Sequence, residues 1–334
     1  MIKRGDWVNY IDLFSGVGGI SLGFEKEGFK NIFSIDFDEQ ACKTYKKNFS
    51  NHNLIEKDIK DLTKKEILNI IKGKEIDVVV GGVPCQSFSM AGNRIRKNTR
   101  NREDERHFLF KEFLRVVQII NPKIAIMENV KGILSSHNGR IKKEIIEGFE
   151  KRGYNVDYQV LNSADYGVPQ IRERAVFIAN KVKKTNLFPE KTHPQEKYIP
   201  VGSVLKNIPK LNHNPRELSG ITLKRVKLIK QGKNWQSLPK ELQTKSVHSG
   251  AYGRLDEKKP SRTIMTRFDT PTVGYVIHPK EHRTLTVREG ARIQTFPDNF
   301  EFVGTNSSQN KQVGNAVPPL MARAIAKQIK KMLD

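Results

Sequence analysis

The sequence of 334 residues contains only two cysteines, Cys42 and Cys85. Two cysteines make no disulfide framework, and such sparse use is typical of a reducing compartment. No apolar run approaches the length that crosses a membrane, and the segment 1–6 is too polar for a signal peptide. We therefore expect a cytoplasmic protein with no membrane as partner.

Acidic residues are also scarce, because 36 Asp and Glu face 59 Lys and Arg, and the net charge is +23. An excess of that size predicts a polyanionic partner, since neutralising phosphates releases counterions. A lysine-rich surface that only keeps the protein soluble is the plainer interpretation. Hydrophobic residues make up 37% of the chain and include 17 Phe, which supports a real core and excludes wholesale disorder.

Short apolar runs alternate with amphipathic segments over the first 180 residues. Alternation of this kind predicts an α/β fold with a doubly wound, mostly parallel sheet, whose ligands bind at the carboxyl ends of the strands. The predicted strands are Val8–Phe14, Ile32–Asp36, Ile76–Val80, Ile124–Glu128, Val156–Leu161 and Ala175–Ala179. The clearest amphipathic helices are Gln40–Phe49, Phe108–Ile120 and Ile141–Lys151.

The composition changes near Lys181, where a Pro- and Lys-rich stretch with short irregular apolar runs begins. Residues 181–282 hold 21 Lys and Arg against 8 Asp and Glu, so +13 of the net charge lies in under a third of the chain. This segment is typical of a separate module that faces nucleic acid. Regular structure returns after it, with helices predicted at Val287–Thr295 and Leu320–Leu333.

A glycine-rich turn, Asp12–Gly19, closes the first strand and opens a helix. Glycines let the backbone approach a ligand, and a helix N-terminus adds partial positive charge. A tight turn without a ligand is the plainer interpretation. The next strand ends in Asp36, where a nucleotide-binding sheet places an acid on ribose hydroxyls, and Phe37 could stack on an adenine ring. Asp58 is a further candidate, for the adenine amino group.

Two neighbouring strands deliver chemically active side chains. Cys85 follows the strand Ile76–Val80 in a Gly/Pro turn, and thiolate is among the best protein nucleophiles. Glu128 ends the next strand, so Cys85 and Glu128 together make a nucleophile–acid pair. Separately, Cys85 could be a small buried hydrophobe and Glu128 a helix N-cap neighbour. It is much less expected that both structural interpretations hold at once.

A pair of arginines, Arg172 and Arg174, precedes the last strand in Gln170–Arg174. Paired guanidinium groups can hold a phosphate or a base carbonyl. The alternative is a solvated run of charges.

These segments, in this order, resemble the cytosine-5 DNA methyltransferases of the bacterial restriction-modification type. The resemblance covers nearly the whole chain, and eight segments in order do not arise by chance. One departure is Asp36, where many members carry Glu, a carboxylate one methylene longer. The matching segments are Asp12–Gly19, Asp36–Phe37, Asp58–Ile59, Pro84–Ser89, Glu128–Val130, Gln170–Arg174, Arg288–Asp298 and Gly314–Pro318.

The resemblance implies a Rossmann-like, class I S-adenosylmethionine-dependent methyltransferase domain with a smaller, irregular target-recognition domain. It assigns residues 1–180 and 308–334 to the first, and 181–307 to the second, with a hinge-side motif at 283–307. The implied cofactor is S-adenosyl-L-methionine, and no metal is implied. The expected cofactor contacts are Asp12, Phe14, Ser15, Gly16, Gly18, Gly19, Asp36, Phe37, Asp58, Ile59, Pro84, Asn315 and Ala316.

The resemblance also implies the chemistry, because carbon 5 of cytosine is a poor nucleophile until the ring is activated. Cys85 thiolate adds to carbon 6 while Glu128 protonates or hydrogen-bonds ring nitrogen 3, so we expect substrate binding to raise the pKa of Glu128. Carbon 5 then attacks the sulfonium methyl group, and loss of its proton expels Cys85. Arg174 is expected at the base carbonyl and Arg172 at the adjacent phosphate. Both ring faces are needed, so the base leaves the helical stack.

The implied substrate is double-stranded DNA, which we expect to be held in a basic cleft between two lobes, because the segment 181–282 carries +13 of the net charge. The segment 87–107 is expected to close over the flipped base. We expect a monomer, with a cognate restriction endonuclease as a candidate partner of the system. The expected DNA contacts are Gln86, Ser89, Arg94, Arg96, Arg254, Arg262, Thr263 and Arg267.

Three alternatives remain at this point. An RNA cytosine-5 methyltransferase shares the architecture, although the segment Pro84–Ser89 and the basic region are typical of the DNA enzymes. A catalytically idle DNA-binding subunit would not need every catalytic position. A nicotinamide-linked dehydrogenase fits the glycine turn alone, and a dinucleotide that raised the melting temperature would favour it.

Overall fold

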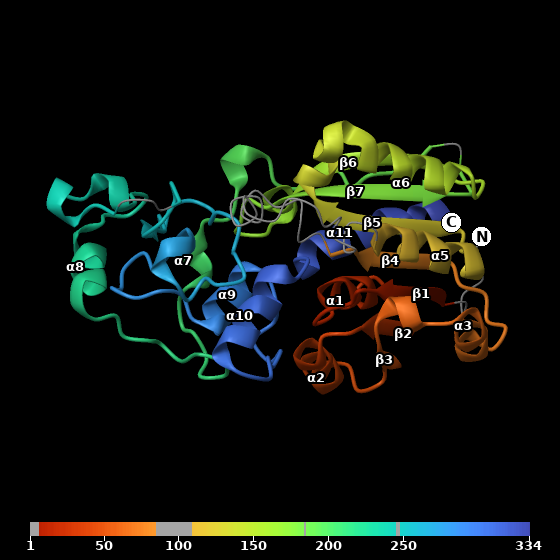
Figure 1. Cartoon of the computed structure of the whole chain (residues 1–334), viewed down its shortest axis with the longest axis horizontal. Helices are drawn as coiled ribbons and strands as arrows, with labels where there is room; N and C mark the ends of the chain where they lie inside the picture. Colours follow the sequence, from red (N-terminus) through yellow and green to blue (C-terminus); the bar gives the residue numbers. More distant parts are fainter. Residues whose placement is uncertain (1–6, 85–108, 184, 245–247) are drawn as a thin grey trace.

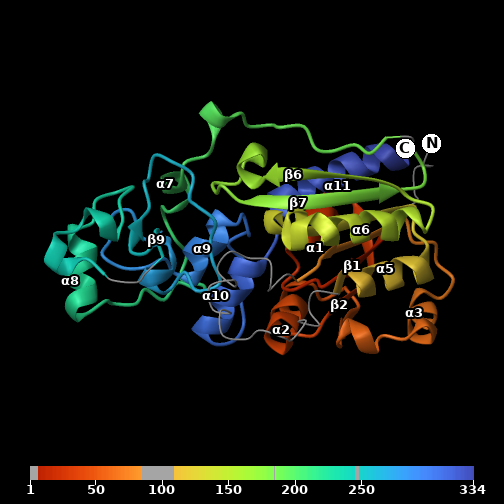
Figure 2. The ribbon, with the colours of Figure 1, turned by 45° about the horizontal axis from the view of Figure 1, so that its top comes forward.

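A computed structural model describes residues 7–84, 109–183, 185–244 and 248–334 of the chain. Two lobes lie side by side along the longest axis (Figure 1). We call the described residues of 7–183 together with the C-terminal helix the sheet lobe, and the described residues of 201–315 the irregular lobe. Figure 2 shows the segment between them, near residue 190, running along the outside of the sheet lobe.

A seven-stranded sheet forms the centre of the sheet lobe, in the order β3-β2-β1-β4-β5-β7-β6. All neighbouring pairs from β3 to β5 are parallel, whereas β7 runs antiparallel to both β5 and β6. The predicted α/β fold with a mostly parallel sheet is therefore confirmed. The strands are β1 (Val8–Leu13), β2 (Phe29–Asp36), β3 (Leu54–Glu56), β4 (Val78–Gly82), β5 (Ile124–Val130), β6 (Asn155–Asn162) and β7 (Glu173–Asn180).

Helices cover both faces of this sheet. Alternate strand residues point to opposite faces, so Ile11 and Leu13 pack with α3, α5 and α6, while Tyr10 packs with α1 and α11. The helices of the sheet lobe are α1 (Gly19–Glu25), α2 (Glu39–Asn48), α3 (Lys64–Ile71), α5 (Leu109–Ile120), α6 (Arg140–Glu150) and α11 (Pro319–Leu333).

Local sequence explains where several of these elements begin. Asp38 accepts the backbone N–H groups of Gln40 and Ala41 and so caps α2, and Thr63 forms a capping box with Glu66 at the start of α3. The prediction began β4 two residues early, at Ile76, and β3 was absent from the predicted strands. Before this strand, the Asp77 carboxylate accepts from Asn9 N–H and Lys123 Nζ, while the Asp77 backbone bonds to Asn9 and Ile124.

The irregular lobe contains little regular structure. Its helices are α7 (Val201–Val204), α8 (Gly220–Leu228), α9 (Val287–Ile293) and α10 (Asn306–Asn315), and its two strands, β8 (Gly253–Arg254) and β9 (Tyr275–Ile277), form a parallel pair. One apolar cluster joins α9 and α10 to Val17, Tyr45 and Phe49 of the sheet lobe. That shared cluster places the irregular lobe against the carboxyl edge of β1 and β2.

Candidate active site

The carboxyl ends of β1, β4 and β5 meet at one edge of the sheet. Chain connections leave β1 toward β2 on one side, and the chain returns to β4 on the other, so the edge between β1 and β4 is a topological switch point. Ligands of open α/β sheets bind at such points. The predicted site residues on β1, β2, β4 and β5 are thereby brought to this edge.

The turn after β1 is fixed by backbone hydrogen bonds. Ser15 N donates to Ile35 O at 3.0 Å, and Gly16 N donates to Asp36 Oδ2 at 2.8 Å. Phe14 has a φ of 59°, a left-handed conformation that a bulky side chain rarely adopts. The turn is therefore held in a strained shape by β2.

The three glycines of this turn have different surroundings. A Cβ on Gly18 would lie 2.4 Å from the Phe49 ring, and one on Gly19 would lie 2.2 Å from Val317 O, so these two positions must be small for packing. A Cβ on Gly16 would meet nothing within 4 Å, and its φ of 53° still favours glycine. Gly16 alone of the three leaves the backbone open to a ligand.

Two buried oxygens near this turn have no partner among the described residues, Asp12 Oδ1 and Ser15 Oγ. Burial raises the pKa of Asp12 to about 7, with Asp36 adding to the effect and a hydrogen bond from Ser21 opposing it. Buried polar atoms are rarely left unpaired, so such atoms point to a missing polar ligand. They fit the polar parts of the expected cofactor.

A hydrogen-bonded chain leads from Asp12 to the surface. Ser21 Oγ donates to Asp12 and lies 2.9 Å from Tyr45 OH, which lies 2.7 Å from His52 Nδ1; His52 Nε2 is 2.6 Å from the exposed Glu25. Sequence reasoning missed this network, because its members lie on β1, α1, α2 and the loop after α2. No local pattern links them.

The predicted nucleotide contacts lie at the ends of β2 and β3. Both carboxylate oxygens of Asp36 accept backbone N–H groups, from Gly16 and Asp38, at 2.8 and 2.9 Å. Phe37 is 62% exposed, and its ring is free to stack on a ligand. Asp58 accepts from Lys60 N at 2.9 Å, and Ile59 is buried beneath the same turn.

Glu128 is buried near the end of β5 and pairs with Arg174 of β7. Its Oε1 lies 3.0 Å from Arg174 Nε, and a Cβ on Gly82 would lie 3.3 Å from its Oε2. The carboxyl group is therefore directed at the end of β4, three residues before Cys85. Burial raises the pKa of Glu128, although Arg174 and Arg172 lower it in turn. A buried acid with a raised pKa is suited to donate a proton.

Arg172 is 2% exposed and bonds to three backbone carbonyls from two segments. Its guanidinium donates to Gly314 O and Ala316 O at 3.0 Å, and more weakly to Ile264 O at 3.4 Å. These contacts join β7 to the irregular lobe and to the loop before α11. They favour a positioning role and leave Arg172 without the surface that the predicted phosphate contact needs.

Two glutamines missed as functional residues complete this junction. Gln170 Nε2 donates to Gln294 Oε1 at 2.7 Å, and Gln170 Oε1 accepts from Ile264 N at 2.8 Å. Gln294 in turn donates to Val313 O at 2.8 Å. Both side chains are fully buried. A sequence signal exists, since both glutamines lie within segments that carry the family resemblance, yet spacing cannot show that they meet.

The other residues predicted to contact the cofactor or DNA lie near the lobe junction or outside the described residues. Asn315 is exposed at the end of α10, Ala316 follows it with its carbonyl bonded to Arg172, and Pro84 is partly exposed after β4. Cys85, Gln86, Ser89, Arg94 and Arg96 lie outside the residues that the structure describes.

The four predicted DNA contacts of the irregular lobe differ in their surroundings. Arg254 is 3% exposed and donates to the carbonyls of Val226, Ile229, His278 and Glu281 at 2.6–2.7 Å, so its predicted base contact does not fit its position. By contrast, Arg262 and Arg267 are exposed. Thr263 Oγ1 donates to Ile171 O at 3.0 Å.

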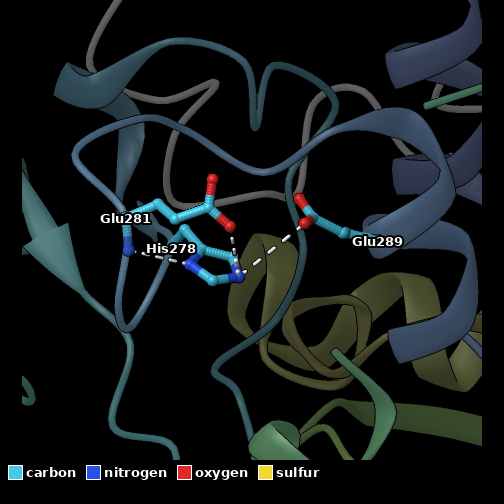
Figure 3. Close-up of side chains that lie close together, drawn as sticks. All are labelled: His278, Glu281 and Glu289. Atoms are coloured by element: carbon cyan, nitrogen blue, oxygen red, sulfur yellow. Dashed lines mark hydrogen bonds and ion pairs between the residues drawn. The ribbon is translucent and has the colours of Figure 1, made fainter. Parts of the chain in front are cut away.

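A cluster of His278, Glu281 and Glu289 has a spacing that could hold a cation (Figure 3). His278 Nδ1 accepts the backbone N–H groups of Lys280 and Glu281, at 3.2 and 3.0 Å, which places the ring proton on Nε2 and removes the lone pair that a metal would need. Arg283 donates to both carboxylates at 2.8–3.0 Å. Arg283 already supplies the positive charge, so the cluster is a set of ion pairs between β9 and α9.

No helix in the described part of the chain is both long and apolar enough to span a bilayer.

Comparison with known proteins identifies the class of enzyme. The chain is 41% identical to the type II methyltransferase M1.HphI of Haemophilus parahaemolyticus, over 97% of this chain and 87% of that one. It is 36% identical to M.NgoFVII of Neisseria gonorrhoeae, over 96% and 85%. A solved DNA modification methyltransferase encoded within an E. coli prophage superposes with a TM-score of 0.78, at 26% identity, over 98% and 99%. Fold and site are those of a methyl-transfer enzyme.

The model of the family described as C-5 cytosine-specific DNA methylase matches residues 8–331. The chain therefore belongs to this family, as the resemblance of its segments implied, and it is a DNA cytosine-5-methyltransferase of the type II restriction-modification kind.

Proposed function

We propose that this enzyme methylates carbon 5 of a flipped-out cytosine within a short duplex sequence, through a covalent bond between Cys85 and carbon 6. The observation that carries the proposal is the buried pair of Glu128 and Arg174. The pair lies at the carboxyl edge of β5, with the carboxyl group directed at Gly82, in the strand that leads to Cys85.

Each residue of the pair has its own task in this proposal. Glu128 donates a proton or a strong hydrogen bond to ring nitrogen 3 while Cys85 adds to carbon 6, so the electron pair of the ring is made available at carbon 5. Arg174 holds the Glu128 carboxyl in place through Nε and donates to the base carbonyl. Arg172 positions this pair against the loop before α11, through Gly314 and Ala316.

S-adenosyl-L-methionine supplies the methyl group as an electrophile when it is bound. We assign its binding to the edge between β1 and β4, where Gly16 opens to space and Asp12 and Ser15 have unpaired oxygens. Phe37 supplies a ring for the adenine, and Asp36 accepts from the ribose with the lone pairs that its two backbone contacts leave. The remaining proposed contacts are Phe14, Gly18, Gly19, Asp58, Ile59, Pro84, Asn315 and Ala316.

The proposed division of the chain matches the two lobes except at α10, whose residues from 308 onward it assigns to the catalytic domain. Residues 1–180 and 308–334 would carry catalysis and cofactor binding, and residues 181–307 would recognise the target. The apolar clusters support this division, because the cluster around Val226, Leu238 and Ile277 contains residues of the irregular lobe alone. We further propose that the enzyme acts as a cytoplasmic monomer on double-stranded DNA, alongside a cognate restriction endonuclease.

The test is transfer of labelled methyl groups to unmethylated bacterial DNA, followed by conversion sequencing to map 5-methylcytosine. Methylation at one recurring short motif is the expected result. Cys85→Ser should abolish transfer but keep DNA binding, because the hydroxyl is a much weaker nucleophile than the thiolate. Undiminished turnover of Cys85→Ser would remove the covalent mechanism, and transfer to tRNA but not to DNA would overturn the proposed substrate.

A further inference from the structure

One arginine of the irregular lobe lies over the face of an aromatic ring. The Arg262 guanidinium carbon lies 3.9 Å from the centre of the Tyr275 ring, while the side chain remains exposed. A contact of this kind uses the face of the guanidinium and leaves the N–H donors at its edge available for hydrogen bonds. Among the described residues Arg262 makes no hydrogen bond or ion pair, in contrast to Arg254, whose guanidinium is bonded to four backbone carbonyls.

The ring of Tyr275 is itself fixed. Tyr275 stands opposite Gly253 in the parallel pair of β8 and β9, and a Cβ on Gly253 would lie 2.4 Å from its Cγ. An aromatic ring that covers a strand glycine in this way is tightly placed. The phenol oxygen accepts from Asn234 Nδ2 at 3.3 Å. Tyr275 is therefore a rigid support for the Arg262 guanidinium group.

Arg262 also lies next to the segment that leads to the active-site arginines. Its neighbour Ser261 donates its N–H to Pro169 O at 2.9 Å and accepts from Ile171 N at 2.8 Å. On the other side, Thr263 Oγ1 donates to Ile171 O at 3.0 Å. The backbone on both sides of Arg262 is thus tied to residues 169–171, directly before Arg172.

We propose that Arg262, held by Tyr275, reads a guanine of the recognition sequence in the major groove, close to the target cytosine. A planar guanidinium can donate two parallel hydrogen bonds to O6 and N7 of guanine, a pattern that no other base offers. Because the guanidinium group is already held over the Tyr275 ring, little side-chain freedom is lost on binding. The inference rests on the proposed function, and Tyr275 acts in it as a positioning residue.

The test begins with the recognition motif of the unaltered enzyme, mapped by conversion sequencing. Methylation rates are then measured on the cognate duplex and on duplexes in which each guanine of the motif, on either strand, is replaced in turn. The variants are Arg262→Lys, Tyr275→Leu and Tyr275→Phe. Lys327→Ala, which removes an exposed charge on α11, is the matched control. Melting temperatures show which variants are folded.

The unaltered enzyme should reject replacement of one particular guanine by roughly 10- to 100-fold. Arg262→Lys should lose that rejection while it keeps the rejection at every other position, since lysine keeps the charge but not the planar fork. Tyr275→Leu should weaken the same position, and Tyr275→Phe should retain it because the ring remains. Lys327→Ala should keep the whole pattern.

Two results would overturn the inference. Slower methylation of every duplex by Arg262→Lys, with all preferences intact, would make Arg262 a phosphate contact. A preference at the same guanine that survives both Arg262→Lys and Tyr275→Leu would assign the reading to other residues. An unaltered enzyme that methylates no DNA would instead remove the proposed function itself, before any variant is compared.

Discussion

The two lobes of this enzyme are held together by different interactions. In the sheet lobe, apolar side chains such as Ile11, Val79 and Ile126 fill both faces of a regular sheet, and the ladders satisfy the backbone. The irregular lobe has only one pair of short strands, so most of its carbonyl groups need other donors. Buried backbone carbonyls without a partner are costly.

Arginines supply those donors. Arg254 bonds to four carbonyls, and Arg288 bonds to those of Leu211, Pro297 and Phe300. Arg292 bonds to the carbonyls of Val204, Lys206 and Asn207. Positive charge in the irregular lobe is thus partly structural, and the charge counted from sequence overstates what can face DNA. Exposed basic side chains such as Arg262 and Lys233 remain for that purpose.

The largest expected effect tests whether the buried acid of the sheet lobe is catalytic. Glu128→Gln should slow methyl transfer by roughly 10²- to 10⁴-fold, because the amide cannot supply the proton for ring nitrogen 3. The measurement is single-turnover methylation of a cognate duplex. Glu173→Gln, which removes an exposed carboxylate one strand away, is the control and should retain the rate. A normal rate for Glu128→Gln would remove its role as the acid.

Arg254 and Arg262 offer a direct contrast within the irregular lobe. Arg254→Ala leaves four buried carbonyls without donors and should lower the free energy of unfolding by about 3–5 kcal/mol. Arg262→Ala should change it by less than about 0.5 kcal/mol, because the side chain is exposed. Denaturant unfolding of both variants measures the difference. Equal stabilities would mean that buried arginines do not hold this lobe together.

Arg172 tests the junction between the two lobes. Arg172→Gln should lower the free energy of unfolding by about 2–4 kcal/mol, since Gly314 O and Ala316 O lose their charged donor. The slope of DNA affinity against salt concentration should stay unchanged, because a residue that touches no phosphate releases no counterion. Loss of about one unit of slope would restore the predicted phosphate contact.

A further expected effect concerns the pH dependence of the sheet lobe. Burial raises the pKa of Asp12 to about 7, so between its usual value near 4 and pH 7 the folded chain keeps a proton that the unfolded chain loses. Stability from this group therefore falls as pH rises through that window, by about 1.4 kcal/mol per unit, and the loss is complete above pH 7.

Asp12→Asn removes this titration while its amide oxygen still accepts from Ser21. The variant should gain stability relative to the unaltered chain between pH 4.5 and pH 8, as measured by denaturant midpoints at both values. Glu25 ends the hydrogen-bonded chain that runs from Asp12 through Tyr45 and His52, so Glu25→Gln serves as a control for the exposed end of that chain. If the stability of Asp12→Asn and of the unaltered chain changed with pH in parallel, the titrating group would be one other than Asp12.

Regular elements were the part of the fold that the sequence predicted well. The alternation of apolar runs and amphipathic segments predicted six of the strands of the large sheet, since buried strands and helices leave a periodic pattern. The reversal of β7 was not predicted, because direction depends on the partner and not on the strand itself. The short strand β3 was absent from the predicted strands for a similar reason, since three residues carry too little pattern.

In the candidate site, too, the sequence predicted some features and could not predict others. Asp12, Asp36 and Glu128 were found from sequence because each ends or adjoins an apolar run, and parallel strands bring their carboxyl ends to one edge. Arg172 and Arg254 were placed at DNA because sequence records their charge. Burial, which decides whether an arginine meets a phosphate or a carbonyl, comes from segments more than twenty residues away.

By itself, the sequence determined the family and most of the central sheet, because periodic apolar patterns and short motifs can be recognised along the chain. Only the tertiary structure decided which glycine is open to a ligand, which arginines bind buried carbonyl groups, and which polar groups meet across the lobes. Gln170 and Gln294 stand 124 positions apart and bond at 2.7 Å. Contacts of that range follow from how the elements pack, and no pattern within either segment specifies them.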